Sequence, residues 1–254
     1  MDDYLSIVEL WLSFSLESAV EIDQRLHNFR ILFAYNSGKI ENDEITYHDT
    51  REVFENGRIL GYSGTPRTIF ELANQRMCYE LLLPMLADKE LISVALVKEV
   101  HAVLTSGTYD QRRYVELGER PGEFKRHDFV VGQSEVVSMP DEVESDVAAL
   151  LSELVDFHED SSGDALLTAA AYFHARFEHI HPFADGNGRV GRTLLNYFLM
   201  INNHPPLIVY DEDKSLYYAA LAAYDVSEDI IPMFEFLRMQ TVKTWTTTLE
   251  RELR

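Results

Sequence analysis

The sequence HPFADGNGRVGR occupies residues 181–192. Gly186 and Gly188 permit positive φ angles and a close approach of the backbone to a ligand. The residues that follow show helical periodicity, so we expect main-chain N–H groups to converge at a helix N-terminus, where anions bind. Arg189 and Arg192 are three residues apart, on one face of that helix. The segment is therefore typical of a site that binds successive phosphates.

The other polar side chains of this segment indicate chemistry as well as binding. Asn187 adds a neutral amide donor. Asp185 would repel phosphate at the mouth of the site unless a divalent cation bridged the two, and Mg²⁺ is the natural choice. His181 carries an imidazole that can accept the proton of an attacking hydroxyl at pH 7. Phe183 is expected to anchor the loop in the core.

Two other interpretations of the same residues fail on their own requirements. The run 186–191 satisfies the pattern G-x-G-x-x-G, but a dinucleotide fold needs an apolar strand before it, and residues 175–179 end a predicted helix. A calcium loop of the EF-hand type would place His181 and Phe183 at ligand positions. It would also place Arg192 where a bidentate glutamate belongs.

A zinc site is the third alternative, and it would use His174, His179 and His181 with Asp185. Zinc sites rarely place two arginines beside the metal, and the lone cysteine, Cys78, is not nearby in the sequence. We assign no chemistry to His174 and His179. Cys78 has no intrachain partner for a disulfide and is expected to be an inert packing residue of a helix.

The composition is that of a globular protein with a strong acidic excess. Of 254 residues 46% are hydrophobic, and 22 Lys and Arg stand against 43 Asp and Glu, for a net charge of −21. This charge disfavours binding to nucleic acid or to an anionic membrane. The start of the chain is acidic, and no apolar run reaches the roughly 18 residues of a membrane span. We expect a cytoplasmic protein.

The spacing of apolar residues predicts a mostly helical chain. Leu166, Ala170, Phe173 and Phe177 line one face of a helix that leads to residue 181. Other helices are expected at about residues 4–35, 67–87, 90–105, 141–158, 188–203, 213–224 and 229–250. The paired valines within 128–139 predict a short hairpin. We expect an all-α fold in a single domain, with a separable domain before about residue 60 as the alternative.

The segment 181–192 resembles the signature H-x-F-x-[D/E]-G-N-G-R-x-x-R of the Fic family. All eight fixed positions match, namely His181, Phe183, Asp185, Gly186, Asn187, Gly188, Arg189 and Arg192.

The resemblance implies a Fic-type helical core with a short β-hairpin flap. It also implies transfer of AMP from ATP to a hydroxyl side chain of a target protein, with release of pyrophosphate. By this resemblance His181 is the general base and Asp185 holds Mg²⁺. The implied nucleotide ligands are Gly186, Asn187, Gly188, Arg189 and Arg192, the last at the terminal phosphate.

Two further segments extend the resemblance. Residues 121–126, PGEFKR, with the valine hairpin resemble the family segment that leads into the flap, which aligns a target peptide by strand addition. Tyr217, Tyr218 and Asp225 resemble the residues that line the family's adenine pocket. Asp225 replaces the usual asparagine and cannot donate a hydrogen bond to the base. The predicted flap consists of Val130, Val131, Gly132, Gln133, Ser134, Glu135, Val136 and Val137.

Residues 37–42, SGKIEN, match the inhibitory pattern [S/T]-x-x-x-E-[G/N] that many Fic proteins carry on an N-terminal helix. The hypothesis is that Glu41 pairs with Arg192 and withdraws the cation that should hold the terminal phosphate. Ser37, one turn earlier, would steady Glu41. A desolvated pair of this kind can change a rate by about a hundredfold or more. The alternative is an ordinary surface pair within one helix.

The sequence therefore predicts an N-terminal helical segment at 1–90, a Fic core at 91–240 and the end of a C-terminal helix at 241–254, in one compact unit. The leading function is an autoinhibited protein adenylyltransferase with Mg²⁺ as cofactor. The alternatives are removal of AMP from targets with Glu41 activating water, and a nucleotide-binding module without turnover. Phosphate or phosphocholine transfer is a further variant of the family. The expected partners are ATP and a target protein, which could be the chain itself, and the resemblance also implies a homodimer.

Overall fold

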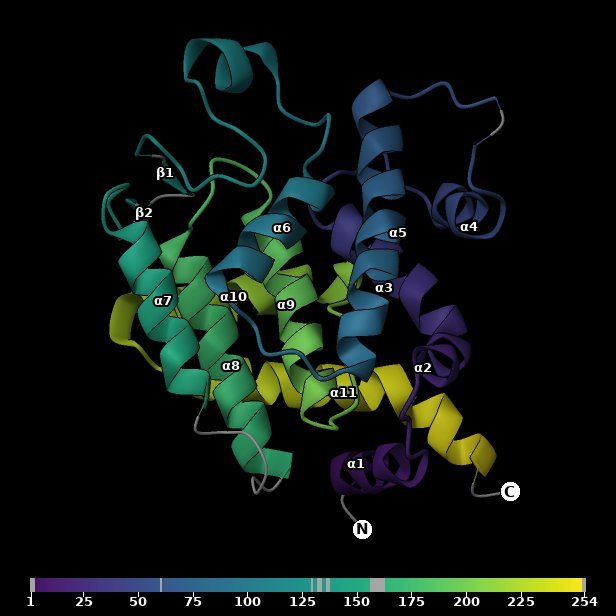
Figure 1. The fold of residues 1–254 in the computed structure, drawn as a ribbon. Coiled ribbons are helices and arrows are strands. Elements are labelled where there is room, and N and C mark those ends of the chain that lie inside the picture. Colours follow the sequence, from purple (N-terminus) through teal and green to yellow (C-terminus); the bar gives the residue numbers. More distant parts are fainter. Residues whose placement is uncertain are drawn as a thin grey trace.

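A computed structural model describes residues 3–59, 61–128, 130–131, 134–135, 138–155 and 163–252. The described chain is mainly helical, as Figure 1 shows, which confirms the predicted all-α class. Its helices are α1 (Asp3–Ser13), α2 (Ala19–Arg25), α3 (His27–Lys39), α4 (Tyr47–Asn56), α5 (Pro66–Ala87), α6 (Val94–Leu104), α7 (Val143–Leu154), α8 (Gly163–Ile180), α9 (Asn187–Ile201), α10 (Lys214–Ser227) and α11 (Ile231–Glu252). Two short segments, η1 (Arg112–Glu116) and η3 (Asp211–Asp213), have π and 3₁₀ geometry.

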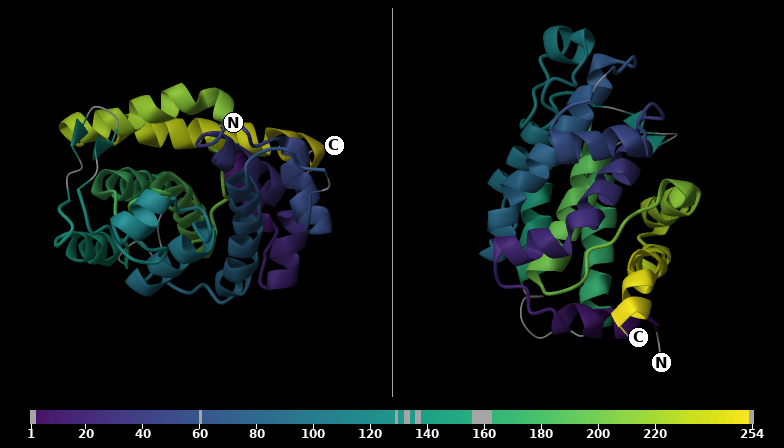
Figure 2. Two further views of the ribbon diagram at one scale, coloured as in Figure 1. Left: turned by 90° about the horizontal axis from the view of Figure 1, so that it is seen from above. Right: turned by 90° about the vertical axis from the view of Figure 1, so that its right-hand side faces the viewer.

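Helix α9 lies at the centre of the fold and packs against α3, α5, α6 and α8. Helices α10 and α11 form a layer on one side of the others (Figure 2), and α1 packs against α11. Both ends of the chain contribute to one main cluster of buried side chains, in which Trp11 packs edge-on against Trp245 with ring centroids 5.2 Å apart. The first turns of α5 and α9 lie at the same end of the molecule (Figure 1).

The N-terminal region differs from the prediction of one long helix at residues 4–35. The helical conformation ends after α1, where Ser15 has a φ of +48°. Helix α2 then starts with a capping box, because the Ser18 hydroxyl accepts from Glu21 N and the Glu21 carboxylate accepts from Ser18 N. Leu26 separates α2 from α3. The helical spacing of apolar residues continues across both helix ends, so the sequence pattern did not indicate them.

Helix α4 was not predicted, although the sequence contains signals for both of its ends. Thr46 caps the N-terminus by accepting from Asp49 N, and Gly57 ends the helix with a φ of +73°. The remaining predicted helices are present, with ends that differ by a few residues.

The segment predicted as a flap contains two very short strands. Val130 pairs with Glu135, and Val131 pairs with Ser134, in antiparallel register. The other predicted flap residues, Gly132, Gln133, Val136 and Val137, lie outside the described residues. A hairpin flap that docks a target therefore stays a prediction.

Cys78 is buried on α5, and burial raises the pKa of its thiol to about 12, so it is the inert packing residue that was expected. In the described part of the chain, the helices are too short or too polar to cross a membrane.

Candidate functional site

The loop between α8 and α9 has the geometry of an anion-binding turn. The apolar face predicted for α8 is buried in the core, and it holds the start of the loop. His181 follows the helix with a φ of +49°, and Gly186 caps α9 with a φ of +82°. Because α9 begins at Asn187, the N–H groups of its first turn have no partner within the helix. They point to the position where phosphate was expected.

Phe183 anchors the loop, as predicted. Its side chain is fully buried and stacks on His101, with ring centroids 3.7 Å apart and the planes within 3°. His101 Nδ1 accepts from Gly122 N at 2.8 Å, so the proton is on Nε2, which donates to the carbonyl oxygen of Asp185 at 3.1 Å. Burial lowers the pKa of His101 to about 4, which keeps the ring neutral. His101 was not predicted from the sequence.

The side chain of Asn187 closes the loop. Its Oδ1 accepts from Phe183 N at 2.8 Å, and its Nδ2 donates to Phe183 O at 2.7 Å. Asn187 is buried, and both of these contacts are buried. The amide group that was predicted to bind phosphate is therefore engaged by the backbone of its own loop.

Replacement of Asn187 by alanine is expected to destabilise the protein by about 2 kcal/mol or more, because two buried backbone groups of Phe183 lose their partners. Chemical unfolding measures this change. Asn56→Ala is the matched control, because the Asn56 amide is exposed and donates to Glu52 on the surface of the same helix, so its loss should stay within about 0.5 kcal/mol. Unchanged stability in Asn187→Ala, together with lost nucleotide binding, would instead assign the amide to the ligand.

The segment 121–126 packs against the loop from the other side. Lys125 N donates to Pro182 O at 2.9 Å, and Lys125 Nζ donates to Ile180 O at 3.3 Å. Burial lowers the pKa of His181 to about 4, and the neighbouring charge of Lys125 acts in the same direction. The imidazole is thus neutral at pH 7, the form that can accept a proton.

Arg192 is enclosed by residues at the end of α3. Its Nη2 donates to Glu41 Oε1 at 3.0 Å and to Ser37 O at 2.9 Å, and its Nε donates to Ser37 Oγ at 3.1 Å. The side chain of Arg192 is 1% exposed and that of Glu41 is 38% exposed. The predicted pair of Glu41 and Arg192 is therefore present. Ser37, however, contacts the arginine, whereas it was expected to steady the glutamate.

Glu41 lies over the first turn of α9. A Cβ atom added to Gly188 would clash with Glu41 Oε1 and with Arg192 Nη1. Glycine at this position lets the two groups lie where they do, because any side chain here would have to push them aside. The carboxylate thus lies beside the helix N-terminus where phosphate was expected.

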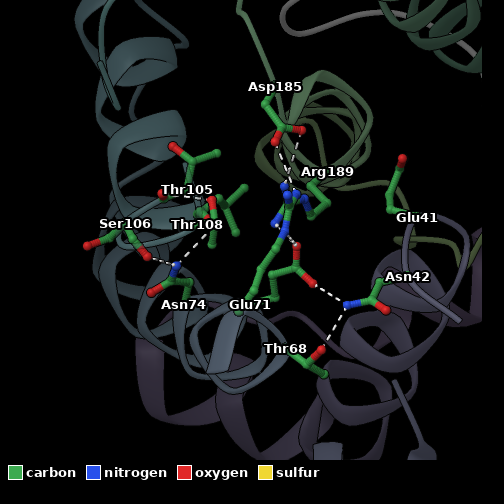
Figure 3. A network of polar contacts seen from close by, with 12 residues as sticks. Glu41, Asn42, Thr68, Glu71, Asn74, Thr105, Ser106, Thr108, Asp185 and Arg189 are labelled. Atoms are coloured by element: carbon green, nitrogen blue, oxygen red, sulfur yellow. Dashed lines mark hydrogen bonds and ion pairs between the residues drawn. The ribbon is translucent and has the colours of Figure 1, made fainter. Parts of the chain in front are cut away.

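The remaining charged groups of the loop are joined to α5 (Figure 3). Arg189 is buried, and its Nη1 lies 3.4 Å from Glu71 Oε1. Glu71, which is 4% exposed, also accepts from Asn42 Nδ2 at 2.7 Å and from Arg67 Nε at 2.9 Å. Arg67 Nη2 in turn donates to Asp185 Oδ2 at 3.0 Å.

Sequence analysis missed Arg67 and Glu71, which lie on the long helix α5 and outside any motif. Glu71 shares a face with Thr68, Leu72 and Gln75, and only the structure shows that all of them are buried. A carboxylate in such a position needs a cationic partner.

Asp185 was predicted to hold Mg²⁺, and its surroundings can be compared with that role. Among the described residues, no three His, Cys, Asp or Glu side chains form a metal cluster. This argues against the zinc alternative within the part of the chain that is described. Mg²⁺ is commonly held by one or two carboxylates together with phosphates and water, and Asp185 supplies one partly exposed carboxylate beside the anion-binding turn. The donor set fits Mg²⁺ that arrives with a nucleotide.

The three residues predicted to line an adenine pocket have different environments. Tyr217 is buried, its hydroxyl is 2.8 Å from His174 Nε2, and its ring lies 5.8 Å from the Arg192 guanidinium. Tyr218 is half exposed. Asp225 Oδ1 is 2.7 Å from His179 Nδ1. In this arrangement Tyr217 packs behind Arg192, and a contact of any of the three with adenine stays a prediction.

Together these features define an all-α protein with a helix N-terminus of the kind that binds anions, an adjacent neutral imidazole and two buried arginines. Residues 91–199 match the model of the Fic/DOC family. This part of the chain is a Fic domain.

Curated relatives and solved structures agree with this assignment. "Protein adenylyltransferase Fic" of Drosophila persimilis is 29% identical over 221 residues, which cover 84% of this chain and 41% of that protein. The chain thus spans about two fifths of the length of the curated relatives that it matches. A Fic domain containing signalling protein from Bacteroides thetaiotaomicron has the same fold, with a TM-score of 0.81, 22% identity and coverage of 98% of this chain and 96% of that one. A Fic family protein from Desulfovibrio desulfuricans has a TM-score of 0.69 and 25% sequence identity, and the match covers 100% of this chain and 76% of that one.

Proposed function

We propose that the chain is a protein adenylyltransferase that moves AMP from ATP to a Ser, Thr or Tyr hydroxyl of a target protein. The observation that carries the proposal is the neutral, half-buried imidazole of His181 beside the N-terminal turn of α9. A base and an anion-binding turn in one loop suit attack of a hydroxyl on a phosphate. The curated relatives named protein adenylyltransferase support the same reaction.

In the proposed reaction the hydroxyl oxygen of the target forms a bond to the α-phosphorus of ATP, and the bond from that phosphorus to the pyrophosphate oxygen breaks. The proton of the hydroxyl passes to His181. The first-turn amides of α9, together with Arg189 and Arg192, hold the phosphates in line for attack. Asp185 would hold Mg²⁺, which would neutralise charge on the phosphates.

We further propose that the resting protein is inhibited. Arg192 donates to Glu41 and to Ser37, so its guanidinium is occupied by protein groups that a terminal phosphate would have to replace. The carboxylate of Glu41 also adds negative charge next to the turn. ATP would then bind in a pose that does not place the α-phosphorus for attack.

A second candidate is removal of AMP from a modified target at the same site. It is favoured by the 38% exposure of Glu41, whose charge also acts on His181. A carboxylate in this position could activate a water molecule. The nucleotide-binding module without turnover is disfavoured by the imidazole, which such a module does not need. Target docking by residues 130–137, a homodimer and a cytoplasmic location remain expectations of the resemblance and of the composition.

The reaction class is tested with ATP that is labelled either at the α-phosphate or at the γ-phosphate. The Glu41→Gly chain is incubated with each nucleotide, alone and with a cell extract as a source of targets. Label should enter protein only from the α-phosphate, and a chelator of divalent cations should abolish the transfer. Transfer of the γ-label would show a kinase reaction instead, and ATP binding without any labelling would favour the binding module. Incubation of the wild-type chain with the AMP-modified product tests removal.

A further inference from the structure

We propose that Arg67 occupies the cation position of Asp185, so that a metal ion and Arg67 exclude each other at this carboxylate. The inference rests on the proposed function, because it takes Asp185 as the magnesium ligand. It adds a residue of α5, outside the Fic model match at 91–199, to the machinery of the site.

The contact between Arg67 and Asp185 is direct and has the geometry of a charge-assisted hydrogen bond. Arg67 Nη2 lies 3.0 Å from Asp185 Oδ2. Two other guanidinium groups lie farther from this carboxylate, because Arg113 Nη1 is 3.8 Å from Oδ2 and Arg189 Nη2 is 3.8 Å from Oδ1. Arg67 therefore covers Oδ2, one of the two oxygens that Asp185 can offer a metal ion, and places its positive charge where the metal charge would lie, while the other two groups supply only nearby charge.

The position of Arg67 in its helix is unfavourable unless the site provides partners. Pro66 begins α5 and Arg67 follows in the first turn, where the positive end of the helix dipole repels a cation. Asp185 and Glu71 offset this repulsion, since each accepts a hydrogen bond from the guanidinium. Arg67 is 41% exposed, so it can turn into solvent without unpacking the core.

The same contacts connect Arg67 with the inhibitory segment. Glu71 accepts from Arg67 and also from Asn42, the residue that follows Glu41 (Figure 3 shows the bond from Asn42). A displacement of residues 37–42 would remove one of the donors to Glu71 and leave its carboxylate freer to draw Arg67 away from Asp185. Residues 37–42 therefore act on two charged groups of the site. Glu41 pairs with Arg192 directly, and Asn42 affects the contact of Arg67 with Asp185 through Glu71.

The inference is tested by the affinity of the protein for Mn²⁺ in the absence of nucleotide. Mn²⁺ serves as a substitute for Mg²⁺, and its binding is measured by the decrease of the electron paramagnetic resonance signal of free Mn²⁺. The acidic surface will bind Mn²⁺ weakly at many places, so the relevant site is defined as the binding that Asp185→Asn removes. Arg67→Gln should bind Mn²⁺ at this site about three- to tenfold more tightly than the wild type, because a hydrogen-bonded competitor is gone. Arg67→Lys keeps the charge and loses the planar guanidinium, so its Mn²⁺ affinity should lie between those of the wild type and Arg67→Gln.

Two matched variants separate occlusion from a general charge effect. Arg76 lies on the same helix and pairs with Glu80 at i+4, as Arg67 pairs with Glu71, but it belongs to another surface. Arg113 lies near Asp185 without covering it as closely. Arg76→Gln should leave Mn²⁺ affinity unchanged, and Arg113→Gln should raise it less than Arg67→Gln does. Circular dichroism of each variant verifies folding.

The possible results lead to distinct conclusions. If Arg67→Gln binds Mn²⁺ no more tightly than Arg113→Gln, Arg67 does not occlude the site and the inference is wrong, while the role of Asp185 is unaffected. If the tighter binding of Arg67→Gln persists when Asp185→Asn is added, the metal lies elsewhere. In that case the inference and the proposed role of Asp185 both fail. Neither conclusion depends on whether the protein transfers AMP.

Discussion

Replacement of His181 by alanine is expected to lower the rate of AMP transfer by about a hundredfold to ten-thousandfold, the usual contribution of a positioned general base. The expectation follows from the neutral state of the half-buried imidazole, which leaves it ready to accept the proton of the target hydroxyl. The phosphate contacts proposed for α9 do not involve this ring, so the affinity for ATP should change little. Initial rates with α-labelled ATP and a separate titration of ATP binding measure the two quantities.

The control for this variant is His48→Ala, because His48 is exposed on α4 and its loss should leave the rate unchanged. The pH dependence gives an independent test. Since the pKa of His181 is lowered to about 4, its base form predominates above that pH, and this group alone should not reduce transfer between pH 7.5 and pH 5.5. An exposed imidazole would be mostly protonated at pH 5.5. A variant that loses ATP binding and transfer in the same proportion would assign His181 to binding.

The features that sequence analysis predicted best are those that depend on neighbouring residues. The glycine turn, the start of α9 and the buried Phe183 follow from local preferences for φ, helix capping and burial. The contact of Glu41 with Arg192 spans 151 residues and was predicted only through a resemblance. No local preference could have indicated it.

The features that were missed depend on how distant helices meet. The network of Arg67, Glu71 and Asp185 forms only because α5 places two side chains next to the loop before α9. The two bonds of Asn187 to the Phe183 backbone could not be predicted for a related reason. A side chain amide in a glycine-rich loop can serve either a ligand or the loop itself, and the positions of the Phe183 backbone groups decide which one it contacts.

Replacement of Glu41 by glycine is expected to raise the rate of AMP transfer by about tenfold to a hundredfold. Arg192 is buried, so the loss of the carboxylate leaves a desolvated cation that favours a new anionic partner, the terminal phosphate. The upper value corresponds to about 3 kcal/mol of transition-state free energy. Solvent screens part of the interaction because Glu41 is 38% exposed, and this lowers the expected range. Initial rates of α-label transfer, at ATP concentrations that saturate each protein, measure the change.

Two further variants separate the loss of the ion pair from other effects of glycine. Asp43→Gly introduces the same backbone freedom two residues away, at an exposed position, and should not activate the protein. Glu41→Gln keeps the length of the side chain and removes its charge, so its rate should lie between those of wild type and Glu41→Gly. Because Arg192 is the group that Glu41 withholds, Glu41→Gly should give no activation in a chain that also carries Arg192→Ala. Equal activation with and without Arg192 would mean that Glu41 acts by blocking the N-terminal turn of α9, where it lies beside Gly188, and that its contact with the arginine is incidental.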